Sequence, residues 1–149
     1  MFTSNIAIVY QKNLLQLKTE IESFKDESNL WKTIEGIANS SGNLCLHMTG
    51  NLNHFVGAGL GNTGYVRNRD AEFADKNIER EKLLQNIDTT MMMIKDVVSK
   101  LSEEDLQKDA PISITAPEKT TEYLLIHLLA HFNYHLGQIN YLRRVIENS

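Results

Sequence analysis

The sequence predicts an all-α fold, a four-helix bundle whose helices are joined by long crossover connections. Four long stretches carry apolar residues at every third or fourth position, which is the period of one face of a helix. Both prolines, Pro111 and Pro117, fall in one short interval, so the helical stretches contain no proline. The 149 residues, 42% of them hydrophobic, can bury the core of one domain, residues 1–149, without disulfides.

The first two helices are predicted before residue 60. The first carries an apolar stripe formed by Ile6, Tyr10, Leu14, Leu17, Ile21 and Phe24. The second spans about residues 43 to 59, and its stripe is formed by Leu44, Met48, Leu52 and Phe55. We expect it to end among Gly57, Gly59 and Gly61, because glycine tolerates the backbone conformations that terminate helices.

The third and fourth helices follow two further stripes. The third stripe is formed by Leu84, Ile87, Met91, Ile94, Val98 and Leu101, and its steps alternate between three and four residues as in bundles, so we expect this helix to lie beside the first. The fourth helix runs from about residue 118 to 147, with a stripe formed by Leu124, Leu128, His131, Gln138, Leu142 and Val145. This stripe predicts that the histidines of the fourth helix face the core.

Three connections are predicted, at about residues 26 to 42, 61 to 73 and 102 to 117. Each is long enough to cross an end of the bundle, which leaves the order of the helices in space open. We expect Trp31 to anchor the first connection, and Ser102 with Asp105 resembles a helix-capping arrangement.

Histidines on two of these helices are the candidate metal ligands. His131 and His135 are four residues apart, so one helical face can present both imidazoles to one ion. His47 lies in the second helix and can supply a third neutral nitrogen, and three protein ligands with an open position are usual for a catalytic metal. The alternative is a set of hydrogen-bonded core histidines without a metal.

Other polar residues are candidates for the surroundings of the site. His127 lies about 80° from His135 around the helix, at about 100° per residue, so we expect it to support the site or to pack rather than to bind the same ion. His54 lies seven residues after His47 and either lines the approach or is solvated, and Asn51 lies on the same helix. Arg67, in a charged segment that also contains Arg69, Asp70 and Glu72, either binds an anionic substrate near the metal or serves in capping.

Composition narrows the classes of partner and location. The formal net charge of −4, with acidic and basic residues interspersed, does not provide the basic stripe that nucleic-acid phosphates need. The single cysteine, Cys45, excludes an intramolecular disulfide, and we expect it to be a small buried hydrophobe. Since there is neither a cationic leader nor an apolar run of about 18 residues, we expect a cytoplasmic protein with no membrane partner.

Two segments carry a resemblance to a known family. HFNYHLGQIN, residues 131 to 140, is similar to the H-x-x-x-H-x-G-Q pattern of the DinB/YfiT-like superfamily, in which a further histidine, here His127, often precedes. The segment from Asn43, NLCLHMTGNLNHFVGAGLG, followed by RNRDAEF, resembles the second helix of an uncharacterised DinB-like subfamily. The resemblance therefore spans about Trp31 to Arg144.

The resemblance implies a four-helix bundle with long crossovers, commonly a homodimer. It implies a divalent metal ion, typically nickel or zinc, held by His47, His131 and His135. It also implies that Gly137 allows close approach of a helix and that Gln138 orients a ligand or bound water.

Function is less uniform in this superfamily than fold. Some relatives join bacillithiol, mycothiol or glutathione to an electrophile, and others resemble metal-dependent hydrolases. An ion held by three neutral imidazoles could lower the pKa of a bound thiol or of water. Because Gln138 does not titrate near neutral pH and no matched residue is an obvious general base, we favour a thiol S-transferase with a small-molecule substrate and a low-molecular-weight thiol as co-substrate. A hydrolase and a non-catalytic bundle that binds metal or ligand are the alternatives.

Overall fold

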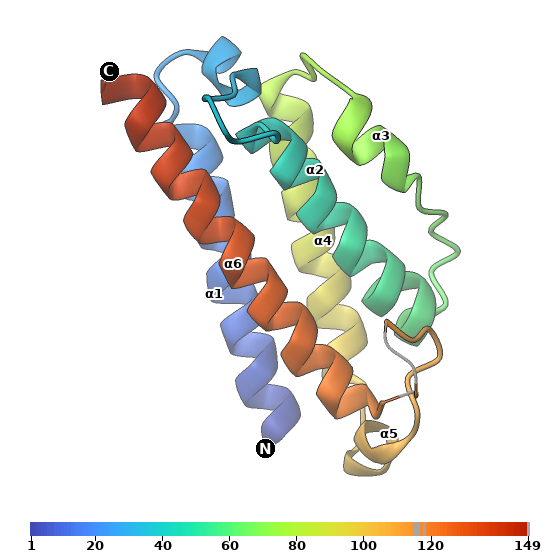
Figure 1. Ribbon diagram of the computed structural model, residues 1–149. Helices are drawn as coiled ribbons and strands as arrows, with labels where there is room; N and C mark the ends of the chain where they lie inside the picture. The colour runs from blue at the N-terminus through green and yellow to red at the C-terminus, as the bar shows by residue number, and fades with distance from the viewer. Residues whose placement is uncertain (115–116, 118, 149) are drawn as a thin grey trace.

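The computed structural model describes residues 1–114, 117 and 119–148, and the regular elements of these residues are all helical, which confirms the predicted all-α class (Figure 1). The long helices are α1 (Phe2–Ser23), α2 (Ser41–Leu52), α4 (Arg80–Ser99) and α6 (Thr121–Asn148). The π-helix η2 (Asn53–Leu60) continues α2 directly. The short helices are the 3₁₀ helix η1 (Glu27–Trp31), α3 (Arg69–Ala74) and α5 (Glu103–Gln107).

The long helices lie side by side with two pointing each way (Figure 1). α1 and α6 run in one direction, whereas α2 and α4 run in the other. α1 packs most extensively against α4, which confirms that the first and third predicted helices are neighbours, and α6 contacts both α1 and α2. The centre of the molecule is therefore shared by four helices, and the site described below lies between α2 and α6.

The middle connection differs from its prediction. α2 and α4 are parallel, so residues 61–79 return along the length of the molecule, whereas the described residues of the other two connections stay at its ends (Figure 1). The predicted connection of residues 61 to 73 was therefore too short. The observed connection, residues 61–79, contains α3, which packs beside α2. The predicted helix start near residue 118 lies outside the described residues, and α6 is described from Thr121.

The apolar stripes form the core. Tyr10, Leu14, Leu17 and Ile21 of α1 are fully buried. The hydroxyl of Tyr10 donates a hydrogen bond to the backbone oxygen of Leu125 at 2.6 Å, which joins α1 to α6 inside the core. A buried hydroxyl needs such a partner, because an unpaired one costs about 1 to 3 kcal/mol.

Local polar contacts set the ends of several elements. Ser102 and Asp105 form a reciprocal capping box at the start of α5, as the sequence indicated. The ring of Trp31 lies against Gly42 of α2, where a Cβ atom would be 2.8 Å from three ring carbons, so Trp31 anchors the first connection. The second predicted helix extends through η2 to Leu60, with Gly61 as its cap.

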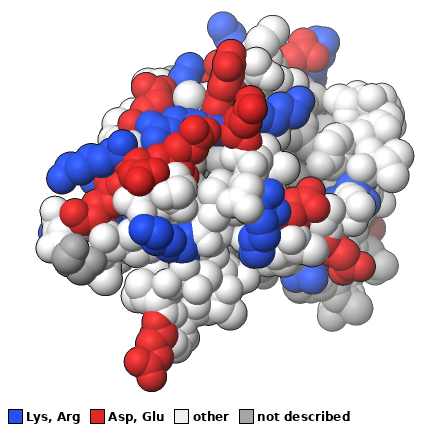
Figure 2. All heavy atoms as spheres, turned by 90° about the horizontal axis from the view of Figure 1, so that it is seen from above, with Lys and Arg blue, Asp and Glu red and all other residues white. Residues whose placement is uncertain are grey.

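The surface carries both signs of charge. Figure 2 looks along the molecule onto the end where α1 and α6 finish, and acidic and basic side chains are interspersed on that face. Within the described residues, we find no helix with the length and apolar character needed to span a membrane.

Candidate metal centre

Three imidazoles meet between α2 and α6. The Nε2 atom of His47 is 3.2 Å from Nε2 of His131, which is 3.1 Å from Nε2 of His135. One nitrogen from each ring lies within 4.8 Å of the others. His47 is buried and the two histidines of α6 are half-buried, so the group is at the edge of the core. These are the three residues that the sequence predicted as ligands.

The distances fit a single ion. Nitrogens bound at about 2.0 to 2.1 Å to one tetrahedral ion are about 3.3 Å apart. The two short Nε2 separations, 3.1 and 3.2 Å, are close to that value. The third pair, His47 and His135, has ring nitrogens within 4.8 Å, so the three histidines are close to the spacing that one ion would impose.

The hydrogen bonds of His47 and His135 leave the Nε2 lone pairs of these two rings facing Nε2 of His131. Nδ1 of His47 donates to Oε1 of Glu72 at 3.0 Å, and Nδ1 of His135 donates to Oε1 of Gln138 at 2.7 Å. A neutral imidazole that carries its proton on Nδ1 has an acceptor at Nε2. One proton on His131 can serve only one of these two acceptors, so a cation is the partner that satisfies all three rings together.

Glu72 orients His47 from α3. Its two carboxylate oxygens accept hydrogen bonds from Nη2 and Nε of Arg67, both at 2.8 Å, in a buried bidentate ion pair. Burial alone would raise the pKa of Glu72, but the hydrogen bonds from Arg67 and His47 outweigh it and lower the pKa. The carboxylate therefore stays ionised and holds the Nδ1 proton of His47 in place.

Gly50 and Phe73 also help to fix the position of His47. A Cβ atom at Gly50 would lie 2.7 Å from the carboxyl carbon of Glu72, so only glycine leaves room for that side chain. The ring of Phe73 lies tilted against His47, with 4.8 Å between ring centroids. The imidazole of His47 is thus fixed by packing on one side and by a charged hydrogen bond on the other.

The surroundings favour the neutral form of the two α6 imidazoles, His131 and His135. Burial is the main cause that lowers the pKa of His131 to about 4, and the nearby His135 and His47 lower it further. Burial also lowers the pKa of His135, against the opposite effect of its hydrogen bond to Gln138. Neutral imidazole is the form that binds a metal ion.

A cavity of about 270 Å³ opens beside two of the three histidines. It is lined by His47, Asn51, Phe55, Arg67, Arg69, Ile114, His127, Leu128 and His131. Three predicted surrounding residues, Asn51, Arg67 and His127, are therefore in place around the cavity. The ring of His127 stacks with Tyr123 at 6.1 Å between centroids.

The two other residues predicted around the site, Gln138 and His54, lie outside this cavity lining. Gln138 contacts His135, but His54 packs edge-on against Phe55 and is not among the residues that line this cavity. The π-helix begins at Asn53 and advances by less than 100° per residue, which brings Phe55 toward the cavity and takes His54 away from it.

The expectation for Gly137 was wrong. Among the described residues, nothing beyond its own helix lies within 4 Å of a Cβ atom built at Gly137. No other described helix of this chain therefore packs closely against Gly137. Instead, it borders a second cavity of about 550 Å³, which has no charged lining residue among those described and is also lined by Gln138.

Sequence reasoning missed the roles of Glu72 and Phe73. Glu72 was placed in a charged segment without a partner, because nothing local shows that α3 packs on α2. Two signals in the sequence could have supported an argument from topology. They are the spacing of Arg67 from Glu72, and Gly50, which lies three residues after His47.

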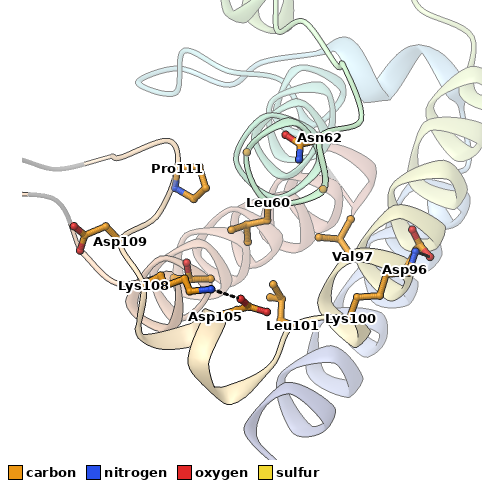
Figure 3. A pocket seen from close by; sticks show the side chains of 13 residues that line it. Leu60, Asn62, Asp96, Val97, Lys100, Leu101, Asp105, Lys108, Asp109 and Pro111 are labelled. Atoms are coloured by element: carbon orange, nitrogen blue, oxygen red, sulfur yellow. Dashed lines mark hydrogen bonds and ion pairs between the residues drawn. The ribbon is translucent and has the colours of Figure 1, made fainter.

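A third cavity, of about 490 Å³, lies where η2, α4 and α5 meet (Figure 3). Four of its five charged lining residues pair with one another: Lys108 contacts Asp105 at 2.9 Å, as drawn in Figure 3, and Lys100 contacts Asp96 at 2.8 Å. No histidine is among its described lining residues. The three-histidine cluster is therefore the stronger candidate for chemistry.

Comparison with known proteins gives a match over nearly the whole chain. The sequence model of one family, described as "Protein of unknown function (DUF1572)", matches residues 5–149. A search of curated proteins found no match.

Proposed function

The chain belongs to the DUF1572 family of proteins of unknown function, and from this premise we propose that it is a divalent-metal-dependent enzyme acting on a small molecule at His47, His131 and His135. The observation that carries the proposal is the set of three histidine rings whose Nε2 atoms converge, while the Nδ1 atoms of His47 and His135 are held by Glu72 and Gln138. Among the described residues, the group contains no fourth histidine, cysteine or carboxylate. An open coordination position is typical of catalytic sites.

The reaction that we favour is transfer of a thiol to an electrophile. A divalent ion such as nickel or zinc at this site would lower the pKa of a thiol or of water. Glu72 is a poor proton acceptor, because Arg67 and His47 occupy its oxygens. Cys45 is buried, and burial raises its pKa to about 12, so the reacting thiol comes from a separate molecule.

Hydrolysis is the second candidate, and one observation supports it. His127 lines the cavity beside His131, and an imidazole in that position can accept a proton from water. His127→Asn separates the two reactions: it slows hydrolysis, whereas addition of an already ionised thiol keeps its rate.

We also assign the fold to the DinB-like four-helix bundles, and we expect a homodimer. The motif from His131 to Gln138, the parallel pair α2 and α4, and the long return connection support this assignment. Exposed apolar side chains, among them Tyr134 and Tyr141 on α6, are suited to contact a second copy. Sedimentation equilibrium tests the dimer, since a monomer mass of 17.0 kDa at all concentrations contradicts it.

The first test is the metal content per chain, measured by elemental mass spectrometry on tag-free protein. We expect near-stoichiometric metal in the wild type, and its loss in His47→Ala and in His131→Ala with the helical circular dichroism retained. His54→Ala is the matched control, because His54 lies in the helical run that contains His47 but does not line the cavity, and it should keep its metal. A wild type that remains metal-free after reconstitution with nickel and zinc would contradict the proposal.

The second test is activity of the metal-loaded protein with thiols and electrophiles. Glutathione with 1-chloro-2,4-dinitrobenzene is a suitable first pair, and a panel of esters and amides tests hydrolysis. We expect turnover by the wild type and His54→Ala, but not by His131→Ala. Full metal loading without turnover on any pair would favour a non-catalytic binding protein.

A further inference from the structure

The cavity beside the cluster contains two arginines in different electrostatic states. Arg67 is neutralised by its bidentate ion pair with Glu72. Arg69, by contrast, is an exposed residue and has no carboxylate within ion-pair distance among the described residues. The cavity therefore holds one uncompensated positive charge from the protein.

Arg69 is held in place by an aromatic ring. Its guanidinium carbon lies 5.2 Å from the centroid of Phe73, and Phe73 in turn packs on His47 at 4.8 Å. A guanidinium stacked on a ring keeps the N–H groups at its edge free, and these match the two oxygens of a carboxylate. Phe73 thus lies between the guanidinium of Arg69 and the imidazole of His47, and it fixes the position of the one relative to the other.

The rest of the cavity limits the kind of ligand. Phe55, Ile114 and Leu128 provide apolar wall, and Asn51 adds a polar group. A volume of about 270 Å³ is slightly below the range of about 300 to 1,000 Å³ that is typical of pockets for drug-sized molecules. The cavity is therefore suited to a short ligand with one apolar part.

We propose that this cavity binds small carboxylates, and that Arg69 is the residue that pairs with their carboxylate group. The proposal rests on the proposed function, because it names the substrate class of the same site. The ion pair to Arg69 and the apolar wall place the rest of the molecule beside His47 and His131. Arg69 acts as a binding residue and takes no part in the proton transfers.

Binding of butyrate, compared with its uncharged analogue butyramide, tests the proposal. Dissociation constants are measured by ligand-observed NMR on metal-free and on zinc-loaded protein at constant ionic strength. We expect saturable binding of butyrate to both forms, about two- to fivefold weaker binding in Arg69→Gln as for an exposed ion pair, and partial recovery in Arg69→Lys. Arg144→Gln is the matched control, because Arg144 also lies over a ring, that of Tyr141 at 5.6 Å, but outside this cavity.

Several results would overturn the proposal: no butyrate binding to the wild type, equal affinity in Arg69→Gln, or butyramide binding as tightly as butyrate. Butyrate that binds only to the zinc-loaded protein, with full affinity in Arg69→Gln, would assign the carboxylate to the ion and not to Arg69. The metal content of each variant is measured in parallel. A wild type that takes up no zinc contradicts the proposed function, while butyrate binding to the metal-free protein still decides the role of Arg69.

Discussion

Gly50 is a small residue on which the position of a charged side chain depends. It faces Glu72 across the contact between α2 and α3, and a methyl group there would overlap the carboxylate. Glu72 has little freedom to move, because Arg67 holds both of its oxygens. A change at Gly50 therefore acts on the Nδ1 partner of His47 without touching the histidines.

We predict that Gly50→Ala weakens metal binding by about 10- to 100-fold, which is the usual effect of losing the partner of a ligating histidine. The metal dissociation constant is measured by competition with a chelator. Gly137→Ala is the control, because a methyl group at Gly137 meets no described neighbour within 4 Å. That control should keep its metal affinity and gain about 0.5 to 1 kcal/mol of stability from the helix preference of alanine.

A double variant shows whether Gly50 acts through Glu72. If it does, Gly50→Ala adds little to the loss of affinity already caused by Glu72→Ala. Fully additive losses would mean that Gly50 supports the site by another route.

The stability of the metal-free protein should depend on pH through His131. Its pKa is about 4 in the folded protein, below the ordinary value of 6.5. The unfolded chain therefore binds this proton at higher pH than the folded chain does, and stability is lost as the pH falls from 6.5 towards 4. Urea midpoints across this range test the effect, and the fall should be smaller in His131→Gln. Parallel curves for the two proteins would show that other groups cause the fall.

At the scale of elements, the last turn of α6 binds the connection that follows α1. Glu147 accepts hydrogen bonds from the backbone N–H groups of Lys25 and Asp26, the shortest at 2.7 Å, and from the side-chain amide of Asn29 at 3.0 Å. The slight burial of Glu147 would raise its pKa, but these donors lower it overall. The carboxylate joins the end of the chain to the turn that follows α1.

We predict that Glu147→Ala lowers the free energy of unfolding by about 1 to 2 kcal/mol, through loss of hydrogen bonds to a charged acceptor. Urea denaturation at pH 7 measures the change. Asn148→Ala, one residue further along and exposed, should change the stability by less than about 0.5 kcal/mol. Equal effects in the two variants would mean that general fraying of α6, and not this clamp, is responsible.

How far an element could be predicted depended on its length. The apolar stripes of α1, α2, α4 and α6 have the helical period over many turns, so these helices were predicted. The buried face of α6 was predicted only in part: Val145 is 49% exposed, and the core contains Phe132, Leu136 and Ile139, which the predicted stripe omitted. α3 and α5 have six and five residues, which is too few for a period to be visible. The change to π geometry at Asn53 also has no counterpart in the stripe, and it moved Phe55 rather than His54 to the cavity.

At the scale of the whole molecule, the site depends on the direction of the helices. The i, i+4 spacing predicted that His131 and His135 share a face, but only the structure shows that α2 crosses that face at His47. Apolar stripes indicate which face is buried and not which neighbour covers it, so the order of the helices stayed open. The position of Glu72 follows from the return of residues 61–79 alongside α2 and could not be predicted from either segment alone.

Because the cluster joins two helices, an ion bound there should stabilise the whole fold. An ion present at 100 times its dissociation constant adds about 2.7 kcal/mol. For a chain of 149 residues, we therefore predict a rise in Tm of about 5 to 10 °C, at about 2 to 4 °C per kcal/mol. Calorimetry with and without zinc tests this prediction. His54→Ala should keep the rise and His131→Ala should lose it, whereas an equal rise in both would place the binding elsewhere.

The contact between Trp31 and Gly42 gives the molecule an optical reporter. The chain has one tryptophan, so its intrinsic indole emission arises from a single place, where the first connection lies on the start of α2. Circular dichroism, in contrast, averages over all the helices. Emission that changes at lower urea than the helical signal would show that this connection separates from α2 before the helices melt, and coincident curves would show that the molecule unfolds as one cooperative unit.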